Sequence, residues 1–302
     1  MKIFARCIKK PSGTDEVCID TYSHAVKTIV IDGVTISHQH PEYTFLLEQT
    51  LEIDEKELMQ LQDTEFIYAE GTAPYRIIDS FKTAFDQVLS YIKYFSFIPQ
   101  LDDKFNAVGM AEWSMDNKNW VKVPMKFKAK WIPGGWIYTL HVSFLEWIPN
   151  FIKDNIRPFF AYVHLHKALS DKDTRHQWID ATIAAELAFK EFLGIYQPDV
   201  LPLIDHLPSP PLSKMYKNIL KDYTGQESPV YKALAKGAEK RNTLVHKPKM
   251  APPTRQETET YLLEVNVAIM HLQYLCYPTS NGMEFLYLHA EEVLKRHLSG
   301  RS

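Results

Sequence analysis

The pattern of apolar residues changes near residue 150, and this change limits the possible folds more than any other feature of the chain. Before it, apolar and polar residues alternate in short runs, which is typical of half-buried β-strands. After it, apolar residues recur every three or four positions, which is typical of amphipathic α-helices. A chain of 302 residues also has the length of two domains. We therefore predict an α+β protein with a β-rich domain over residues 1–150 and an antiparallel helical bundle over residues 151–302.

The first half contains three strand signals: a hairpin pattern around Asp-Gly, an alternation of apolar side chains with lysine, and a run that follows Pro-Gly-Gly. They occupy residues 27–37, 121–131 and 136–147. Pro124 within the second run favours a strand at the edge of a sheet, because proline has no backbone N–H to donate to a neighbouring strand. Two helices are expected among the strands, over residues 54–62 and 76–95.

The second half contains a series of helical segments, which are expected to begin near Thr174, Ser213, Ser228, Thr254 and Met283. Ser228 and Pro229 form a typical N-cap and first-turn pair. Thr254 and Glu257 have the spacing of a capping box, in which each side chain bonds to the backbone of the other residue. These signals predict where two helices of the bundle start.

Composition and motifs exclude several classes of protein. No apolar run approaches the roughly 18 residues needed to span a bilayer, and the first residues lack the pattern of a secretory signal. The three cysteines, Cys7, Cys18 and Cys276, are odd in number and form no Cys-x-x-Cys pair, which suits a reducing compartment. The phosphate-binding, dinucleotide-binding and nucleophile-elbow motifs are absent from the sequence. We expect a cytoplasmic protein without contact to a membrane and without a cofactor.

The segment EKRNTLVHKP, residues 239–248, does not fit an ordinary helix surface. The apolar spacing of its helix calls for an apolar residue at position 241, where Arg241 stands instead; the apolar positions are Tyr231, Leu234, Ala238 and Val245. On the helix from Thr174, Glu186 interrupts a similar apolar stripe. A buried charge is costly unless it is paired, so we predict that Glu186 and Arg241 face each other. The pair could serve only the stability of the bundle, or it could hold Arg241 in place within a functional site.

Asn242 and His246 are four residues apart, so they share a helix face. Pro248 disfavours helical geometry at Lys247 and should end the helix near His246, where an imidazole is accessible and suited to proton transfer. Lysines surround this segment, and the candidates for contact with RNA are Lys236, Lys240, Lys247 and Lys249. The alternatives are that the lysines form a solvated helix face and that His246 is only a helix-end residue.

The hexapeptide from Arg241 to His246 resembles the motif of the HEPN domains (higher eukaryotes and prokaryotes nucleotide-binding). That motif is an arginine, a polar residue and, a few positions later, a histidine near the end of a bundle helix. Residues 179–193, IDATIAAELAFKEFL, are similar to the earlier family helix with its embedded acid. The capped helix from Thr254 stands where the next family helix does. The resemblance covers roughly residues 155–276 and says nothing about residues 1–150.

The resemblance implies a metal-independent endoribonuclease that forms a homodimer and joins two motifs in one cleft. It assigns catalytic roles to Arg241, Asn242 and His246 and a supporting role to Glu186, and it implies 2′,3′-cyclic phosphate products. By analogy, the chain is similar to ribonucleases of bacterial toxin or antiphage defence systems, with the N-terminal domain sensing a ligand or protein trigger. The alternative is a non-catalytic HEPN-like protein that dimerises and binds a nucleotide or a partner.

Two other residue groups have spacings or compositions that occur in functional sites. His38 with His40, and His164 with His166, are each two apart, which in a strand would place both rings on one face, as in some metal sites. No acid or cysteine cluster accompanies them, so no metal site is predicted. The tryptophans of the first half are expected to serve packing rather than base stacking; they are Trp113, Trp120, Trp131 and Trp136.

Overall fold

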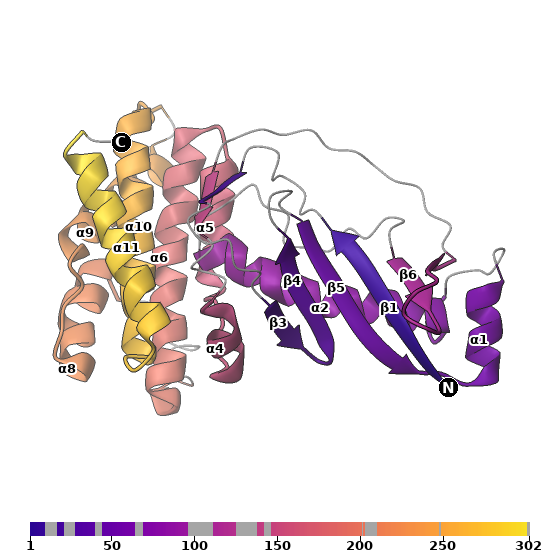
Figure 1. The fold of residues 1–302 in the computed structure, drawn as a ribbon. Helices are drawn as coiled ribbons and strands as arrows, with labels where there is room; N and C mark the ends of the chain where they lie inside the picture. Colours follow the sequence, from indigo (N-terminus) through magenta and orange to yellow (C-terminus); the bar gives the residue numbers. More distant parts are fainter. Residues whose placement is uncertain are drawn as a thin grey trace. The chain divides into compact units, whose positions relative to one another are not determined.

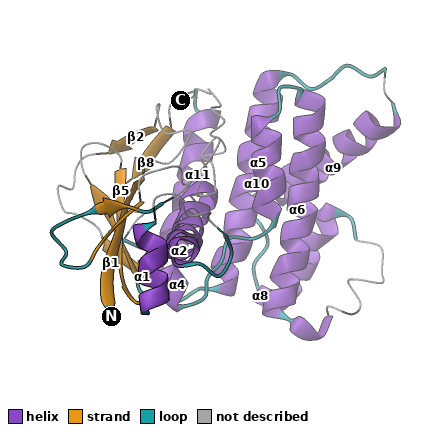
Figure 2. Cartoon of the chain, turned by 90° about the vertical axis from the view of Figure 1, so that its right-hand side faces the viewer, coloured by secondary structure: helices purple, strands orange, loops and turns teal. Residues whose placement is uncertain are grey.

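The computed structural model describes residues 1–9, 17–20, 28–39, 44–63, 69–95, 111–124, 138–141, 146–200, 202, 210–247 and 249–300. The protein is α+β as predicted: an antiparallel sheet lies in the first half, and the second half is mostly helical (Figures 1 and 2). The chain divides into two compact units, Met1–Asn155 and Ile156–Ser302. The sequence pattern placed this division at residue 150.

The first unit contains a six-stranded sheet in the order β3-β4-β5-β1-β6-β7, and every neighbouring pair is antiparallel. The strands are β1 (Lys2–Lys9), β3 (Thr28–Ile31), β4 (Val34–Gln39), β5 (Thr44–Glu52), β6 (Ala111–Ser114) and β7 (Val121–Lys122). β7 lies at an edge, where Pro124 was expected to place its strand. The remainder of the predicted 121–131 strand, from residue 125, lies outside the described residues. A separate pair, β2 (Val17–Asp20) and β8 (Tyr138–His141), is parallel.

The hairpin predicted around Asp32 and Gly33 is confirmed, since β3 and β4 pair from Ile31 and Val34 outward. Both turn residues have positive φ, 47° at Asp32 and 78° at Gly33. Positive φ at both central positions defines the turn whose twist matches the two flanking strands, and Asp-Gly is among the pairs that adopt it at low cost.

Helix α2 (Ala73–Phe95) packs on this sheet, and α1 (Glu55–Gln62) precedes it behind a capping box at Asp54. The predicted apolar stripe of α2 is buried at all five positions, Ile78, Phe81, Phe85, Val88 and Ile92. The Phe85 ring meets Phe45 of β5 with centroids 5.2 Å apart. Helix α4 (Ile148–Lys153) ends the unit and brings Phe151 against Tyr91 and Phe95 of α2.

The second unit is a bundle of α5 (Ala161–Ser170), α6 (Thr174–Tyr196), α9 (Tyr231–His246), α10 (Arg255–Cys276) and α11 (Asn281–Leu298). Between α6 and α9 lie a short 3-10 turn (Pro198–Val200), a π-helix (Lys214–Ile219) and α8 (Leu220–Thr224). α6 contacts α5, α9 and α10, and α11 contacts α10 (Figure 1). α9 runs antiparallel to both α6 and α10, whereas the neighbouring α6 and α10 run in the same direction, since Thr174 bonds to Pro253 and Thr182 to Tyr261.

Two helix starts differ from prediction. The segment expected to begin near Ser213 is a π-helix that continues into α8. Helix α9 begins at Tyr231, and Val230 rather than Ser228 stands at its N-cap position. Ser228 is fully buried and instead accepts hydrogen bonds from the Val230 and Tyr231 amides in the preceding turn. The Ser-Pro pair therefore shapes the entry to the helix without belonging to it.

Candidate functional site at the end of helix α9

A close contact with α10 fixes the position of helix α9. A Cβ atom at Gly237 would collide with the ring of Tyr261, so only glycine permits this approach. The Trp178 indole donates a hydrogen bond of 3.0 Å to the Gly237 carbonyl and stacks on Tyr261, with ring centroids 4.3 Å apart. The Tyr261 hydroxyl in turn hydrogen-bonds Thr182 of α6 at 3.0 Å. α6, α9 and α10 are thus locked together about two turns before the C-terminal end of α9.

The C-terminal end of α9 is held by Arg175, near the start of α6. Its guanidinium donates to the Leu244 carbonyl at 2.7 Å and to the Met250 carbonyl at 2.5 Å. The last carbonyls of a helix have no partner within the helix, so a side-chain donor there both satisfies and orients them. Arg175 therefore fastens the helix end and the turn that follows it to the rest of the bundle.

Arg241 lies on the packed side of α9, one turn from the buried Gly237 and one turn from the buried Leu244. The side chain is half-buried. Its Nη1 donates to Asn242 Oδ1 at 3.0 Å, whereas its buried Nε has no hydrogen-bond partner within the described residues. No carboxylate there forms an ion pair with it. Arg241 therefore lies on the packed side of the helix, as the apolar spacing predicted. No acid neutralises its charge in the described part of the chain.

The predicted ion pair between Glu186 and Arg241 is wrong. Glu186 lies 3.7 Å from Lys190 on its own helix, and 38% of its side chain is exposed. The stripe of α6 that contains Glu186 also contains Ile179 and Ile183, which are only half-buried. The fully buried side of α6 is built largely from Ala181, Ala184, Ala185 and Ala188. Phe189 and Leu193 of the predicted stripe are buried, so the predicted face is right in the second half of α6. It is wrong in the first half, where small alanines let neighbouring helices approach closely.

Asn242 and His246 are exposed on one side of α9, and the helix ends at His246 as predicted. Lys247 follows as the C-cap, and Pro248 lies outside the described residues. Val245, which was expected in the apolar stripe, is 46% exposed because the packed side continues through Leu244. Arg241, Asn242 and His246 therefore lie within two turns of one helix, with Arg241 turned toward the bundle and the other two toward solvent.

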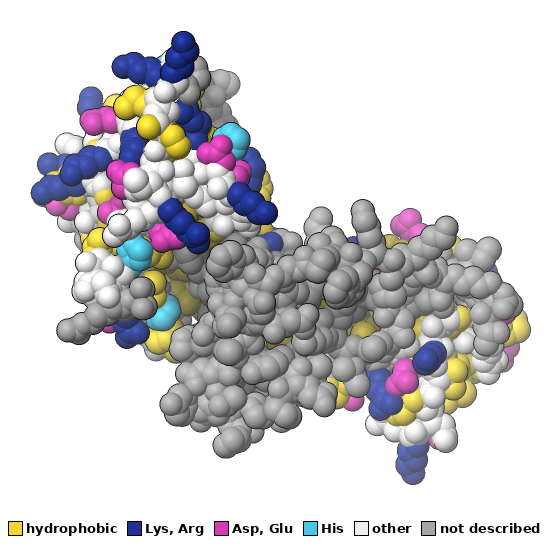
Figure 3. Space-filling model, turned by 90° about the horizontal axis from the view of Figure 1, so that it is seen from above, with side chains coloured by type: hydrophobic (Ala, Val, Ile, Leu, Met, Phe, Trp, Pro, Cys, Tyr) yellow, Lys and Arg dark blue, Asp and Glu magenta, His cyan; other side chains and the backbone are white. Residues whose placement is uncertain are grey.

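The four lysines predicted to bind RNA have different surroundings. Lys236, Lys247 and Lys249 are exposed, and none of them forms an ion pair within the described part of the chain. The ammonium of Lys240 instead pairs with Glu257 at 3.0 Å and lies 4.6 Å from the ring centroid of Trp178. Figure 3 looks onto the end of the bundle where α9 finishes, and it shows several Lys and Arg side chains there with Asp and Glu side chains among them.

The start of α10 is fixed by the same acid that holds Lys240. Glu257 and Thr254 form the predicted capping box. Hydrogen bonds from the Thr254 amide, the Lys240 ammonium and the Thr254 hydroxyl lower the pKa of Glu257 to about 2. Lys240 and Glu257 thus join the middle of α9 to the first turn of α10.

The two histidine pairs do not form a site in the described part of the chain. His164 and His166 lie on helix α5 rather than on a strand, so they point to different sides: His166 is buried, and His164 packs edge-on against Phe160. The side chain of His38, and all of His40, lie outside the described residues. Within the described ranges, no group of three or more His, Cys, Asp or Glu residues has the geometry to hold a metal ion.

Two of the four tryptophans can be placed, and they differ in exposure. Trp113 of β6 is buried, which agrees with a packing role. The ring of Trp120 is half-buried, and the Arg6 guanidinium lies 4.0 Å from its centroid. Trp131 and Trp136 lie outside the described residues.

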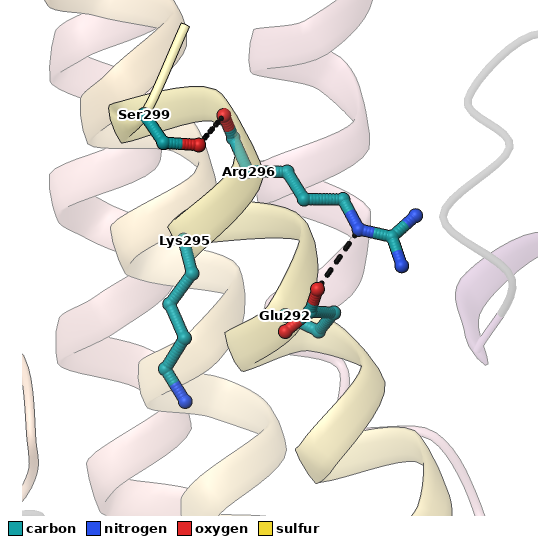
Figure 4. A pocket seen from close by; sticks show the side chains of 4 residues that line it. All are labelled: Glu292, Lys295, Arg296 and Ser299. Carbon is teal, nitrogen blue, oxygen red and sulfur yellow. Dashed lines mark hydrogen bonds and ion pairs between the residues drawn. The ribbon is translucent and has the colours of Figure 1, made fainter. Parts of the chain in front are cut away.

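A surface pocket on α11 is lined by Glu292, Lys295, Arg296 and Ser299 (Figure 4). Arg296 pairs with Glu292 at 2.9 Å, and Lys295 with Glu291 at 3.5 Å, so its cations are neutralised by their own helix. It contains none of the predicted site residues.

Sequence reasoning missed the residues that position α9, which are Arg175, Trp178, Gly237 and Tyr261. Only Gly237 carried a signal, because a glycine in a helix interior costs about 1 kcal/mol relative to alanine and so indicates a packing constraint.

Comparisons with known proteins give no match: no model of a protein family, no curated protein and no solved structure matches this chain. In the part of the chain that the structure describes, every helix is too short or too polar to traverse a lipid bilayer.

Proposed function

We propose that the protein is a metal-independent endoribonuclease whose active site contains Arg241, Asn242 and His246. The observation that carries this proposal is the half-buried Arg241 guanidinium, which has no carboxylate partner in the described residues and lies beside a helix end that presents His246 to solvent. The Nε of this guanidinium is buried and has no hydrogen-bond partner within the described residues, and a phosphate oxygen would supply one. The exposed lysines nearby would draw a polyanion to the same place.

The chemistry needs a base, an acid and a cation. One imidazole takes the proton of an RNA 2′-hydroxyl, whose oxygen attacks the adjacent phosphorus. The bond from phosphorus to the 5′-oxygen breaks, and a second acid protonates that oxygen, which leaves a 2′,3′-cyclic phosphate and a 5′-hydroxyl. Arg241 stabilises the added negative charge, and Asn242 holds its guanidinium through the 3.0 Å hydrogen bond. Each chain supplies one His246, so a homodimer that joins two motifs provides both proton-transfer groups.

The resemblance to HEPN ribonucleases supports this assignment and its setting. It covers the helical unit only, where a motif helix and a capped helix follow each other as α9 and α10 do. On the same analogy, the β-rich unit senses a ligand or protein trigger, and the enzyme acts in the cytoplasm as a toxin or antiphage effector.

The test is incubation of the purified full-length protein with RNA in EDTA, alongside His246→Ala, Arg241→Lys and the control His289→Ala. His289 is exposed on α11 and lies outside the motif. We expect cleavage by the wild type and the control, and a loss of roughly 10²-fold or more in His246→Ala. Arg241→Lys should also be strongly impaired, because lysine keeps the charge but loses the planar fork. RNA that is bound but left intact by the wild type would indicate a non-catalytic nucleotide-binding or dimerisation protein instead.

A further inference from the structure

A second cluster of cations lies at the opposite end of α9 from the motif. The Lys217 ammonium, from the π-helix, is 5.1 Å from the ring centroid of Tyr231, and the Lys232 ammonium is 5.9 Å from the same centroid. Both lysines are exposed, and neither forms an ion pair within the described residues. The ring attracts each ammonium, and the two ammonium groups together make a positive surface that an anion can bind.

The segment from this cluster to the motif is rich in cations, although two of its lysines face acids of α10: Lys240 pairs with Glu257, and Lys236 interacts with Glu264. Between residues 210 and 250 there are nine cationic side chains and three acids, in a chain whose net charge is −3. The cations are Lys214, Lys217, Lys221, Lys232, Lys236, Lys240, Arg241, Lys247 and Lys249, and the acids are Asp222, Glu227 and Glu239. Lys232, Lys236 and Lys247 lie along one side of α9 and its end, because their spacing of four and eleven residues follows the helical repeat.

The linear arrangement fits a strand better than a single nucleotide. Fifteen residues separate Tyr231 from His246, which is roughly 22 Å along a helix. A stacked strand covers this span with about six nucleotides at ~3.4 Å each, and an extended strand needs fewer. Aromatic rings flanked by cations are typical of single-strand binding, in which a base stacks on the ring and the cations hold the neighbouring phosphates.

We infer that Lys217, Tyr231 and Lys232 form a second contact for single-stranded RNA, several nucleotides away from the bond that is cleaved at His246. This inference rests on the proposed ribonuclease function and adds a substrate class to it. The enzyme then acts on RNA that is long enough to reach both ends of α9. A dinucleotide is too short to reach Lys217, Tyr231 and Lys232 while it is bound at His246.

The experiment compares the wild type with the double variant Lys217→Glu/Lys232→Glu and with a control of equal charge change, Lys118→Glu/Lys122→Glu. The control lysines are exposed in the first unit. Two readouts are needed: binding of a 12-nucleotide 2′-O-methyl RNA that cannot be cleaved, and cleavage of a 12-nucleotide RNA and of a dinucleotide. Unfolding by circular dichroism checks that each variant folds.

We expect the double variant to bind the 12-nucleotide RNA at least tenfold more weakly and to show a salt dependence reduced by about two phosphate contacts. Its KM for the long RNA should rise while kcat changes little, and cleavage of the dinucleotide should be unchanged. Tyr231→Phe should retain binding and Tyr231→Ala should weaken it, since only the ring is required for stacking.

The inference is overturned if the control weakens binding equally, if long and short substrates are affected alike, or if anionic phospholipid vesicles bind this surface and RNA does not. Failure of the ribonuclease proposal gives a different result: the long RNA still binds through Lys217 and Lys232, but the wild type does not cleave it.

Discussion

Arg241 lies between two buried positions of α9, Gly237 and Leu244, yet its charge has no carboxylate partner within the described residues. Within that part of the chain its guanidinium donates a hydrogen bond to the adjacent Asn242, which is uncharged. A structural arginine at such a position would be expected to pair with an acid from a facing helix. At the scale of single residues, this unpaired guanidinium is the feature that most favours an anionic ligand over a purely structural role.

Glu186 gives the first prediction at this scale. Because it is partly exposed and, among the described residues, pairs only with Lys190 of its own helix, Glu186→Ala should cost less than about 0.5 kcal/mol of unfolding free energy. The double variant Glu186→Ala/Arg241→Ala should equal the sum of the single variants in urea unfolding. A coupling of 1 kcal/mol or more would show that the two residues meet after all.

The second prediction at the residue scale concerns Gly237. Alanine is the better helix former by about 1 kcal/mol, but its Cβ would collide with Tyr261 and separate α9 from α10. Gly237→Ala should therefore lower the unfolding free energy, whereas Ala238→Gly, one position further on the same helix, should lose only the propensity difference. An increase in stability for Gly237→Ala would contradict the close contact.

At the scale of elements, the contact between α10 and α11 contains a titratable core residue. His271 is 2% exposed, and its ring lies 5.1 Å from Tyr287 of α11. Burial lowers the pKa of His271 from 6.5 to about 4, although Glu291 opposes this change. The imidazole therefore stays neutral in the folded protein under conditions where it is protonated in the unfolded chain.

The consequence is a pH dependence of stability. Between pH 6.5 and about 4 the unfolded state binds more protons, so the unfolding free energy should fall as the pH falls, by an amount on the order of 3 kcal/mol. In His271→Gln this part of the decline should be missing. Urea unfolding at several pH values checks it, and parallel curves for the two proteins would refute the assignment.

Sequence patterns predicted where helices and strands lie in the chain better than they predicted which side of each helix is buried. Alternation and three-to-four spacing located β3, β4, α2 and α10, whose large apolar residues are buried as expected, and they also located α1 and α6. They assigned the wrong face to the first half of α6, where Ala181, Ala184 and Ala185 are buried and Ile179 and Ile183 are only half-buried, and they misplaced the start of α9, where Ser228 is buried in a turn. The π-helix could not be predicted either, since no local residue preference distinguishes it from an α-helix.

At the scale of the whole molecule, the same limits apply to the candidate site. The position of the motif at the end of α9 follows from local signals. The residues that hold α9 in place, Arg175 and Trp178, come from α6 and lie 69 and 59 residues before their partners in the sequence. A single sequence contains no local signal for such long-range contacts, so these residues could only be found in the structure.

A shared active site makes activity depend on concentration. If two copies of His246 act together, the specific activity should fall when the protein is diluted below its dimer dissociation constant. Mixing inactive His246→Ala into the wild type in excess should suppress cleavage for the same reason. Specific activity that is constant across the dilution range in which the protein becomes monomeric would show that one chain suffices.

The most direct test of the central claim uses an oligonucleotide that is 2′-O-methylated at every position except one. If His246 and Arg241 direct a 2′-hydroxyl onto the adjacent phosphate, the wild type cleaves only after the single 2′-hydroxyl, in EDTA, and mass spectrometry finds a 2′,3′-cyclic phosphate on the product. His246→Ala leaves the oligonucleotide intact. Cleavage at a 2′-O-methylated position, or full activity in His246→Ala, would contradict the account.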